Sequence, residues 1–301
     1  LGRFSFIGSE PFLMLKSKGR AIEIVSNEKT QRFNGNPFEE LRKLLNNYKI
    51  EKQSYDVPFL GGAVGYLGYD LKYFIERLPD ISSGDINIPD MFFMFYSSVI
   101  VFDHLKNEIF LSANGFPEDK KFREKKARED MVRLKGCLAS YGHKKALTKR
   151  AKNKSYCITS NFKREDYISA INKAKEYIKN GDIYQVNLSQ RFSCRVKQEP
   201  FAIYKRLSGI SPSCFSSFFN FGDFYIVSAS PERFLRLEKD LVYTRPMKGT
   251  RGRGATHSED ARLRGDLLRS NKDKAELMMI VDLERNDLGR VCKYGSIDVK
   301  S

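Results

Sequence analysis

The sequence has few of the residues that build metal clusters, and it lacks the long apolar runs that cross membranes. Its 301 residues include five cysteines and three histidines, and none follows the spacing of a metal site. An odd number of cysteines without such spacing indicates free thiols in a reducing cytoplasm. No apolar run approaches the roughly 18 residues that a membrane span needs, and no secretory leader precedes the first predicted strand. We therefore expect a cytoplasmic protein without a membrane anchor.

Aromatic residues are scarce in the most basic part of the chain. The formal net charge is +16, and such a charge favours contacts with nucleic-acid phosphates. Lys120 to Lys154 is dense in lysine and arginine, but only Phe122 and Tyr141 supply aromatic rings there. Surfaces that bind RNA interleave aromatic rings for base stacking. We interpret this stretch as a solvated helix and linker, and nucleic-acid binding stays a remote alternative.

The pattern of the chain changes near residue 155. Before it, short strands alternate with turns, and one helix is predicted from Pro37 to Tyr48 with Asn36 as its cap. Residues 144–155 are basic and almost free of large apolar side chains, which is typical of a linker. The sequence therefore divides into an N-terminal region, residues 1–154, and a second region, residues 155–301.

The second region mixes helices with strands. One helical face runs from Tyr167 to Ile178, and Gly181 ends that helix. A long strand is predicted from Tyr184 to Val196, with Gln185 on its polar face. The chain ends with a helix from Asp273 through Leu283. Hairpins are predicted over Cys214–Ala229 and Phe234–Thr244. The fold class is therefore a mixture of α and β with mostly antiparallel strands.

Lys248 lies on a tight bend between a proline turn and a Gly-Thr pair. It follows Glu232 by sixteen residues. A lysine packed on such a bend can act as an amine nucleophile, and a neighbouring glutamate can supply the acid. A structural ion pair between Glu232 and Lys248 is the alternative, and the spacing alone favours it.

Asp273 and Glu276 are three residues apart on the last predicted helix. Both carboxylates therefore project from one face, and two such groups can meet a hard cation such as magnesium. Helix capping is the alternative, with Asp273 as the N-cap and Glu276 completing a capping box. The residues by themselves favour the cap.

Several motifs resemble signatures of the chorismate-utilising enzymes, in the same order and at matching spacing. They are Gly61–Asp70, Tyr184–Phe192, Ser228–Phe234 and Asp273–Val291. The resemblance implies two large, mainly antiparallel sheets packed face to face with helices outside, as in anthranilate synthase. It also implies that residues 155–301 form the first half of the chorismate-binding catalytic region. The chain is expected to be truncated at both ends.

Within that family, the pattern Pro246-Met247-Lys248-Gly249-Thr250 resembles the aminodeoxychorismate synthases. The resemblance implies amination of chorismate at C4, in para-aminobenzoate and folate biosynthesis. Lys248 would add at C2, Glu232 would protonate the departing hydroxyl, and ammonia would come from a glutamine amidotransferase partner. Anthranilate synthase component I, which typically has alanine at the position of Lys248, stays the alternative.

The resemblance also assigns binding residues. Glu276 maps to a magnesium ligand and Asp273 to its acidic neighbour, and the family's remaining metal-site glutamates are expected beyond Ser301. Arg245, Gly249 and Thr250 are expected at the substrate, together with Gln185. Isochorismate and salicylate synthases have a water-activating lysine at the position of Gln185. Glutamine has no basic nitrogen, so ammonia is the expected nucleophile.

Overall fold

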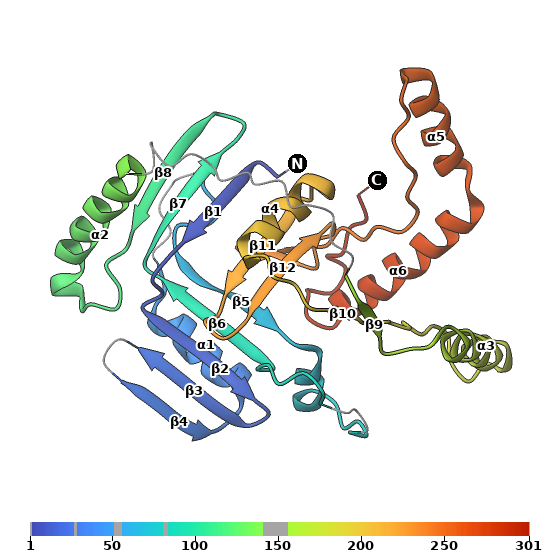
Figure 1. Cartoon of the computed structure of the whole chain (residues 1–301), viewed down its shortest axis with the longest axis horizontal. Helices are drawn as coiled ribbons and strands as arrows, with labels where there is room; N and C mark the ends of the chain where they lie inside the picture. Colours follow the sequence, from blue (N-terminus) through green and yellow to red (C-terminus); the bar gives the residue numbers. More distant parts are fainter. Residues whose placement is uncertain (1, 27–28, 51–55, 81–83, 141–155, 301) are drawn as a thin grey trace. The chain divides into compact units, whose positions relative to one another are not determined.

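The structure is a computed structural model that describes residues 2–26, 29–50, 56–80, 84–140 and 156–300. It divides into two compact units (Figure 1). One unit combines residues 1–143 with residues 206–301, and the other comprises residues 144–205. The predicted region boundary at residue 154 and the predicted linker lie outside the described residues. The division into residues 1–154 and 155–301 therefore stays a prediction.

A five-stranded antiparallel sheet forms the centre of the first unit. Its strand order is β4-β3-β2-β6-β5. The strands are β2 (Leu13–Lys18), β3 (Ala21–Ser26), β4 (Thr30–Asn34), β5 (Gly62–Leu67) and β6 (Met91–Tyr96). On one face, Leu15, Ile22 and Phe95 are almost completely buried. Because side chains alternate along a strand, this face collects the apolar residues of three neighbouring strands.

Helix α1 (Pro37–Asn47) covers this apolar face. The Asn36 side chain accepts a hydrogen bond from the Phe38 amide at 3.0 Å, and Pro37 occupies the first turn. The predicted helix start is therefore confirmed. Leu44 of α1 is buried in the same cluster as Leu15. A short 3₁₀ helix, η1 (Tyr69–Phe74), adds Leu71 to that cluster.

After β6 the chain passes through Ser97 into β7, the central strand of a second sheet. It has three antiparallel strands in the order β1-β7-β8. They are β1 (Phe4–Gly8), β7 (Ser98–Asp103) and β8 (Glu108–Ala113), and α2 (Lys120–Ser140) packs against β7 and β8. Only Ser97 separates β6 from β7. Its hydroxyl accepts a hydrogen bond from the Phe116 amide and its carbonyl accepts one from the Asn114 side chain, and these bonds interrupt the strand there.

The glycines of β5 allow close approach of two backbones. A Cβ atom at Gly65 would lie 1.9 Å from the Phe92 carbonyl oxygen of β6. No other residue avoids that clash, so a glycine is required here. Gly65 thus lets β5 lie directly against the backbone of β6.

A hairpin from the C-terminal part of the chain packs on the other face of the five-stranded sheet. It consists of β11 (Phe215–Asn220) and β12 (Tyr225–Ser230). Phe221 at its turn is buried with Phe92 and Met94 of β6. Two antiparallel sheets therefore meet face to face, and the predicted mixed α+β class is confirmed. The remaining elements of this unit are β13 (Arg236–Glu238), β14 (Leu241–Tyr243), α5 (His257–Arg269) and α6 (Asn271–Gly289).

The second unit contains β9 (Ile158–Ser160), α3 (Arg164–Asn180), β10 (Phe192–Cys194) and the start of α4 (Pro200–Ile210). Gly181 ends α3 in the left-handed conformation, as predicted. The long strand predicted from Tyr184 to Val196 is wrong, because only Phe192–Cys194 pairs with a neighbour, β9. A strand needs partners for its backbone groups, and no strand of the described sheets includes or pairs with Tyr184–Gln190.

None of the described helices is both long enough and apolar enough to span a membrane.

Candidate functional site

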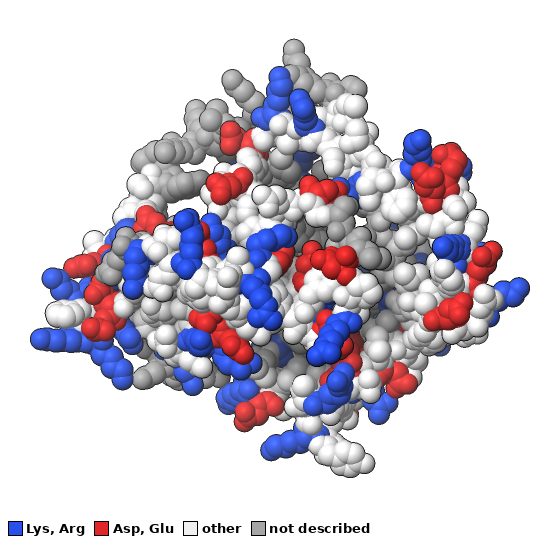
Figure 2. Space-filling view, turned by 90° about the horizontal axis from the view of Figure 1, so that it is seen from below, with Lys and Arg blue, Asp and Glu red and all other residues white. Residues whose placement is uncertain are grey.

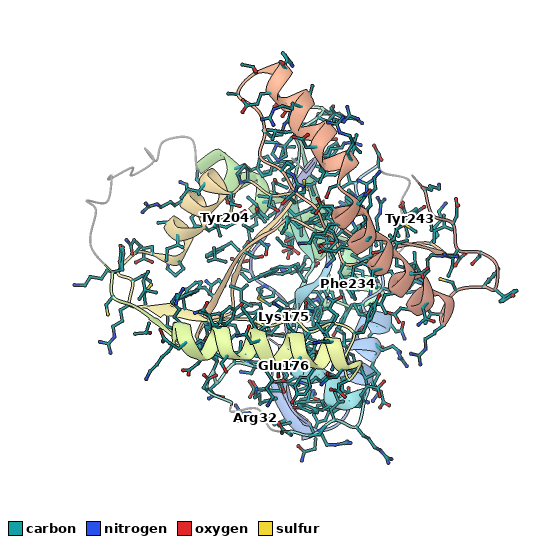
Figure 3. The ribbon with its side chains drawn as sticks, turned by 90° about the vertical axis from the view of Figure 1, so that its right-hand side faces the viewer. Arg32, Lys175, Glu176, Tyr204, Phe234 and Tyr243 are labelled. Carbon is teal, nitrogen blue, oxygen red and sulfur yellow. The ribbon has the colours of Figure 1, made fainter. Side chains whose placement is uncertain are left out.

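Glu232 and Lys248 come from two segments that a short hairpin brings together. β12 ends at Ser230, and β13 and β14 then form a hairpin in which Arg236 pairs with Tyr243. Figure 3 labels Tyr243, which ends this hairpin, and Phe234, which precedes it. The Thr244 hydroxyl donates a hydrogen bond to the Phe234 carbonyl at 3.0 Å. The chain therefore returns beside Glu232 when it enters the segment that carries Lys248.

The Glu232 carboxylate is held by the residue before Lys248. Its Oε1 accepts a hydrogen bond from the Met247 amide at 2.7 Å. Glu232 and Lys248 are both exposed, and no ion pair joins these two described residues. We call residues 244–251 the Lys248 loop. Glu232 anchors this loop near its centre, at Met247. The structural ion pair between Glu232 and Lys248, which was the alternative interpretation, is therefore not formed.

The other end of the Lys248 loop rests on the first turn of α6. Arg251 Nη2 donates to Asp273 Oδ2 at 2.7 Å. A Cβ atom at Gly249 would lie 2.7 Å from Asp273 Cγ and 2.8 Å from Leu267 Cδ1. Gly249 is therefore required by this close approach, and the structure brings Gly249, Lys248 and Asp273 into one neighbourhood.

Asp273 is not the helix cap that the capping alternative assumed. Helix α6 starts at Asn271, two residues before the predicted start, and extends to Gly289. Ser270 is the N-cap, and its hydroxyl accepts a hydrogen bond from the Asp273 amide at 3.3 Å. The pattern of a serine three residues before an acidic residue signals such a start. The Ser270 hydroxyl and the Arg251 guanidinium hold the pKa of the Asp273 carboxyl below its usual value.

Glu276 lies one turn further along α6 and has weak partners. Its only described ion pair is with Lys272, whose Nζ lies 3.8 Å from Glu276 Oε1, and 46% of the Glu276 side chain is exposed. The part of the chain that the structure describes contains no group of three or more His, Cys, Asp or Glu residues that could hold a metal ion. Of the two predicted metal-site carboxylates, Glu276 has free oxygen atoms, whereas Arg251 binds Asp273.

Arg245 and Thr250 flank Lys248 on the surface. The Thr250 carbonyl accepts a hydrogen bond from Arg251 Nη1 at 2.8 Å, and both Arg245 and Thr250 are exposed. Gln185 belongs to the other unit and follows α3 in an exposed segment without regular structure. Its predicted contact with the substrate therefore stays a prediction.

Further residues that the sequence analysis did not single out support the chain between the Lys248 loop and α5. Asp260 accepts hydrogen bonds from Arg253 at 2.7 and 2.8 Å and from the Gly254 amide at 2.9 Å. The Arg253 guanidinium is the main cause of the lowered pKa of Asp260. Thr256 caps α5 by accepting from the Glu259 amide. The Thr-x-x-Glu pattern signals this helix start in the sequence, although the Glu259 carboxylate accepts from the Ala255 amide and not from the Thr256 amide.

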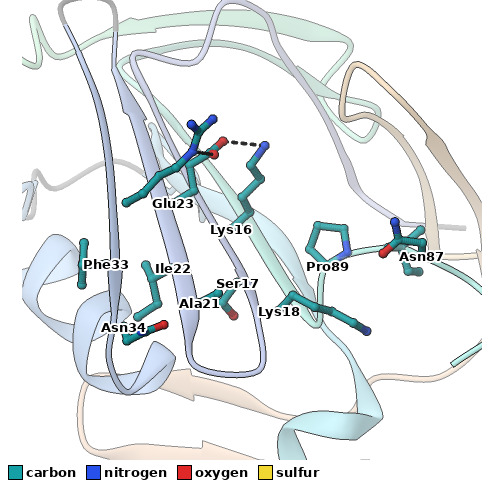
Figure 4. A pocket seen from close by; sticks show the side chains of 12 residues that line it. Lys16, Ser17, Lys18, Ala21, Ile22, Glu23, Phe33, Asn34, Asn87 and Pro89 are labelled. Carbon is teal, nitrogen blue, oxygen red and sulfur yellow. Dashed lines mark hydrogen bonds and ion pairs between the residues drawn. The ribbon is translucent and has the colours of Figure 1, made fainter.

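A hollow of about 500 Å³ on the five-stranded sheet contains none of the predicted site residues. Strands β2, β3 and β4 and the chain before β6 line it (Figure 4). Glu23 forms ion pairs with Lys16 at 2.6 Å and Arg32 at 2.5 Å, and these lower its pKa. Lys18 pairs with Asp90 at 2.6 Å. The three cations of this hollow are thus bound by carboxylates, and we assign no chemistry to it.

Acidic and basic side chains are interspersed on the face of the molecule that Figure 2 shows. On α2, for example, Arg128 pairs with Glu124 at 2.5 Å and Lys126 with Asp130 at 3.2 Å. This mixture differs from the continuous basic surface that favours nucleic-acid phosphates. Nucleic-acid binding remains the remote alternative.

Comparison with known proteins shows the family of this chain. Residues 9–301 match the family of chorismate binding enzymes. The chain belongs to this family, so the family-level resemblance seen in the sequence is confirmed.

Relatives within the family carry two different names. The chain is 37% identical to anthranilate synthase component 1 of Acetivibrio thermocellus, over 99% of this chain and 62% of that protein. It is 32% identical to aminodeoxychorismate synthase component 1 of Bacillus subtilis (strain 168), over 99% of this chain and 63% of that protein. The assignment to the aminodeoxychorismate synthases therefore stays a prediction.

A solved structure of the same family has a similar fold. The crystal structure of anthranilate synthase component I from Streptococcus pneumoniae TIGR4 superposes with a TM-score of 0.78 at 29% identity. The match covers 96% of this chain and 62% of the other chain. The chain therefore spans less than two thirds of the length of these relatives.

Proposed function

We propose that the protein aminates chorismate at C4 to give 4-amino-4-deoxychorismate. The observation that carries this proposal is the hydrogen bond of 2.7 Å from the Met247 amide to Glu232 Oε1. It holds a carboxyl group next to the lysine of a Pro-Met-Lys-Gly-Thr segment. A nucleophile and an acid in one place are the two groups that the first chemical step needs.

In that first step, Lys248 adds as a neutral amine through Nζ to C2 of chorismate. The ring double bonds shift, and the bond between C4 and its hydroxyl oxygen breaks. Glu232 transfers a proton to the departing hydroxyl, which leaves as water. Because the Met247 amide binds Oε1, Oε2 of Glu232 is the oxygen available to carry that proton.

In the second step, ammonia attacks C4 and the double bonds shift back. The bond between C2 and Nζ breaks, and Lys248 leaves as an amine. The surplus proton of the bound ammonia passes to the Glu232 carboxylate, which restores the acid. The enolpyruvyl ether stays intact. In this proposal Gln185 contributes no base for water, and a glutamine amidotransferase partner supplies the ammonia in the cytoplasm.

Magnesium is the proposed cofactor, and Glu276 is the residue that fits it. A hard cation prefers carboxylate oxygens, and among the described residues the one ion pair of Glu276 is with Lys272, at 3.8 Å. When bound, the ion would neutralise a substrate carboxylate. Arg245 and Lys248 would attract the chorismate dianion by charge, and Gly249 and Thr250 would lie against it. Asp273 fits less well, because Arg251 already binds its Oδ2.

Anthranilate synthesis is the second candidate. The observation in its favour is the 37% identity to anthranilate synthase component 1 of Acetivibrio thermocellus. In that reaction the enolpyruvyl group would be lost as pyruvate and the ring would become aromatic. Lys248 would then act as a substrate-binding charge and not as a nucleophile.

Product analysis distinguishes the two candidates. Full-length protein is incubated with chorismate, magnesium and ammonium, and the products are identified by mass spectrometry. We expect 4-amino-4-deoxychorismate with its enolpyruvyl group retained. Anthranilate with free pyruvate as the main product would favour the second candidate. Isochorismate or salicylate would contradict the argument from Gln185.

A further inference from the structure

Arg251 connects the Lys248 loop to helix α6 through two kinds of partner. Its Nη2 donates to Asp273 Oδ2 at 2.7 Å, and its Nη1 donates to the Thr250 carbonyl at 2.8 Å. The Arg251 side chain is 37% exposed and that of Asp273 only 18%. One guanidinium group thus binds the backbone of its own loop and a mostly covered carboxylate on the helix.

Gly249 brings the Lys248 loop into close contact with the Asp273 side chain. A Cβ atom there would lie 2.7 and 2.8 Å from Cγ and Cβ of Asp273. The loop therefore rests directly on the side chain that Arg251 binds. Because Ser270 accepts from the Asp273 amide, the position of Asp273 is itself defined by the start of α6.

Lys248 lies between two anchors that are four residues apart. On one side, the Met247 amide donates to Glu232 at 2.7 Å. On the other side, Arg251 bonds to Asp273 at 2.7 Å. Two fixed points this close leave the backbone of Lys248 little freedom, although its side chain is exposed.

We propose that Arg251 and Asp273 form a positioning pair that holds Lys248 in place, and that Asp273 acts in this pair and not as a metal ligand. The expected effect of this pair on catalysis rests on the proposed function of Lys248. Its effect on the conformation of the Lys248 loop is independent of that function. In this arrangement a metal ion would bind Glu276, and Asp273 would set the distance between Lys248 and the helix that carries Glu276.

Limited proteolysis tests the loop directly in the 301-residue chain. Trypsin cleaves after Lys248 only when the loop opens, and the rate of cleavage follows the open population when opening is fast. Asp273→Asn keeps the size of the side chain and every trypsin site. Loss of one partly exposed ion pair should make cleavage after Lys248 about fivefold faster, as followed by mass spectrometry of the first products.

Matched variants separate the positioning pair from a general change in charge. Arg251→Lys keeps the positive charge and should leave cleavage near the wild-type rate. Asp266→Asn removes the same charge from an exposed pair of α5, where Arg262 lies 3.3 Å away, and should have no effect. Arg251→Ala also removes the hydrogen bond to the Thr250 carbonyl, so it should speed cleavage at least as much as Asp273→Asn. The double variant should be no faster than Arg251→Ala, because the bond between Arg251 and Asp273 is already lost in that variant.

A wild-type cleavage rate for Asp273→Asn would overturn the proposal, and so would independent, multiplying effects of the two substitutions. In the full-length enzyme, Asp273→Asn and Arg251→Ala should both lower kcat while the magnesium concentration for half-maximal activity stays unchanged. A shift of that concentration for Asp273→Asn alone would show a metal ligand. If the proteolysis result holds and Lys248→Ala keeps full activity, the positioning pair stands and the proposed function fails.

Discussion

The N-terminal part of the chain and the part that carries the candidate site are stabilised in different ways. Every buried hydrophobic residue of the described chain except Phe221 lies between Phe12 and Leu134. Beyond residue 155, large apolar side chains such as Tyr184, Phe234 and Val291 are 78%, 86% and 78% exposed. The N-terminal part thus has a packed core, whereas helix caps, ion pairs and a close glycine contact hold the site.

This difference has a consequence for mutations. A residue in the packed core affects the free energy of unfolding, because removing it leaves a cavity. A residue at the site affects the geometry of a loop and leaves the core unchanged. Function and stability should therefore respond to substitutions in different parts of the chain.

The largest expected effect is on turnover at the site. Lys248→Ala should lower the rate of full-length enzyme more than a thousandfold, because loss of a purely electrostatic partner costs only about a hundred- to thousandfold. Steady-state kinetics with ammonia as the nitrogen source measures this loss. Thermal unfolding of the variant should match that of the wild type, since the Lys248 side chain is exposed.

Trapping of the covalent adduct is an independent test of the role of Lys248. In the Lys248→Ala variant, ammonia that attacked chorismate directly from the space left by the lysine would mask the loss of rate. Wild-type enzyme held with chorismate and without ammonia should carry an adduct on the peptide that contains Lys248. The nucleophile role is wrong if that peptide stays unmodified and Lys248→Ala keeps near-normal turnover.

The second effect is on stability and lies in the N-terminal core. Phe95 is 1% exposed and contacts the rings of Phe12 and Tyr48. Phe95→Ala should lower the free energy of unfolding by about 3 to 5 kcal/mol. Phe234→Ala, the matched change at an 86% exposed ring, should alter it by less than about 0.5 kcal/mol. Urea unfolding of both variants measures the two changes in the free energy of unfolding. Equal changes would contradict the difference between a packed N-terminal core and an exposed C-terminal part.

The third effect concerns magnesium. Glu276→Gln keeps the size of the side chain but removes its charge, so the magnesium concentration for half-maximal activity should rise at least about tenfold. Helix content by circular dichroism should not change, because Ser270 and not Glu276 caps α6. Unchanged magnesium activation would show that Glu276 is not a ligand.

The smallest effect is a pH dependence in the N-terminal part. The Arg3 guanidinium, 2.8 Å from Asp103, lowers the pKa of Asp103 to about 2, and the amides of Leu105 and Lys106 contribute. Because the unfolded-state pKa is higher, roughly 3.9, the stabilisation is present above about pH 4 and is lost as the pH falls toward 2. Asp103→Asn should therefore flatten the acid limb of the melting temperature measured against pH. An identical acid limb would contradict this linkage.

Much of the local structure follows from the sequence, because short-range patterns decide it. Asn36 before Pro37 defines the start of α1, and Gly181 defines the end of α3. The hairpin of β11 and β12 follows from two short runs with aromatic and β-branched residues around a Phe-Gly-Asp turn. The chorismate-binding family also follows from motifs that are contiguous in the sequence.

Contacts between distant segments were decided only by the tertiary structure. The sequence selected Glu232 and Lys248, but only the fold shows that Glu232 bonds to the Met247 amide and not to the Lys248 ammonium. It selected Asp273 as a cap or a metal-site residue, whereas the fold assigns the cap to Ser270 and pairs Asp273 with Arg251. The strand predicted from Tyr184 to Val196 has alternating apolar residues, but in the described sheets only Phe192–Cys194 forms a strand, which pairs with β9. Periodicity reports which face of an element is apolar, but a carboxylate or an amide takes the partner that the folded chain brings within reach.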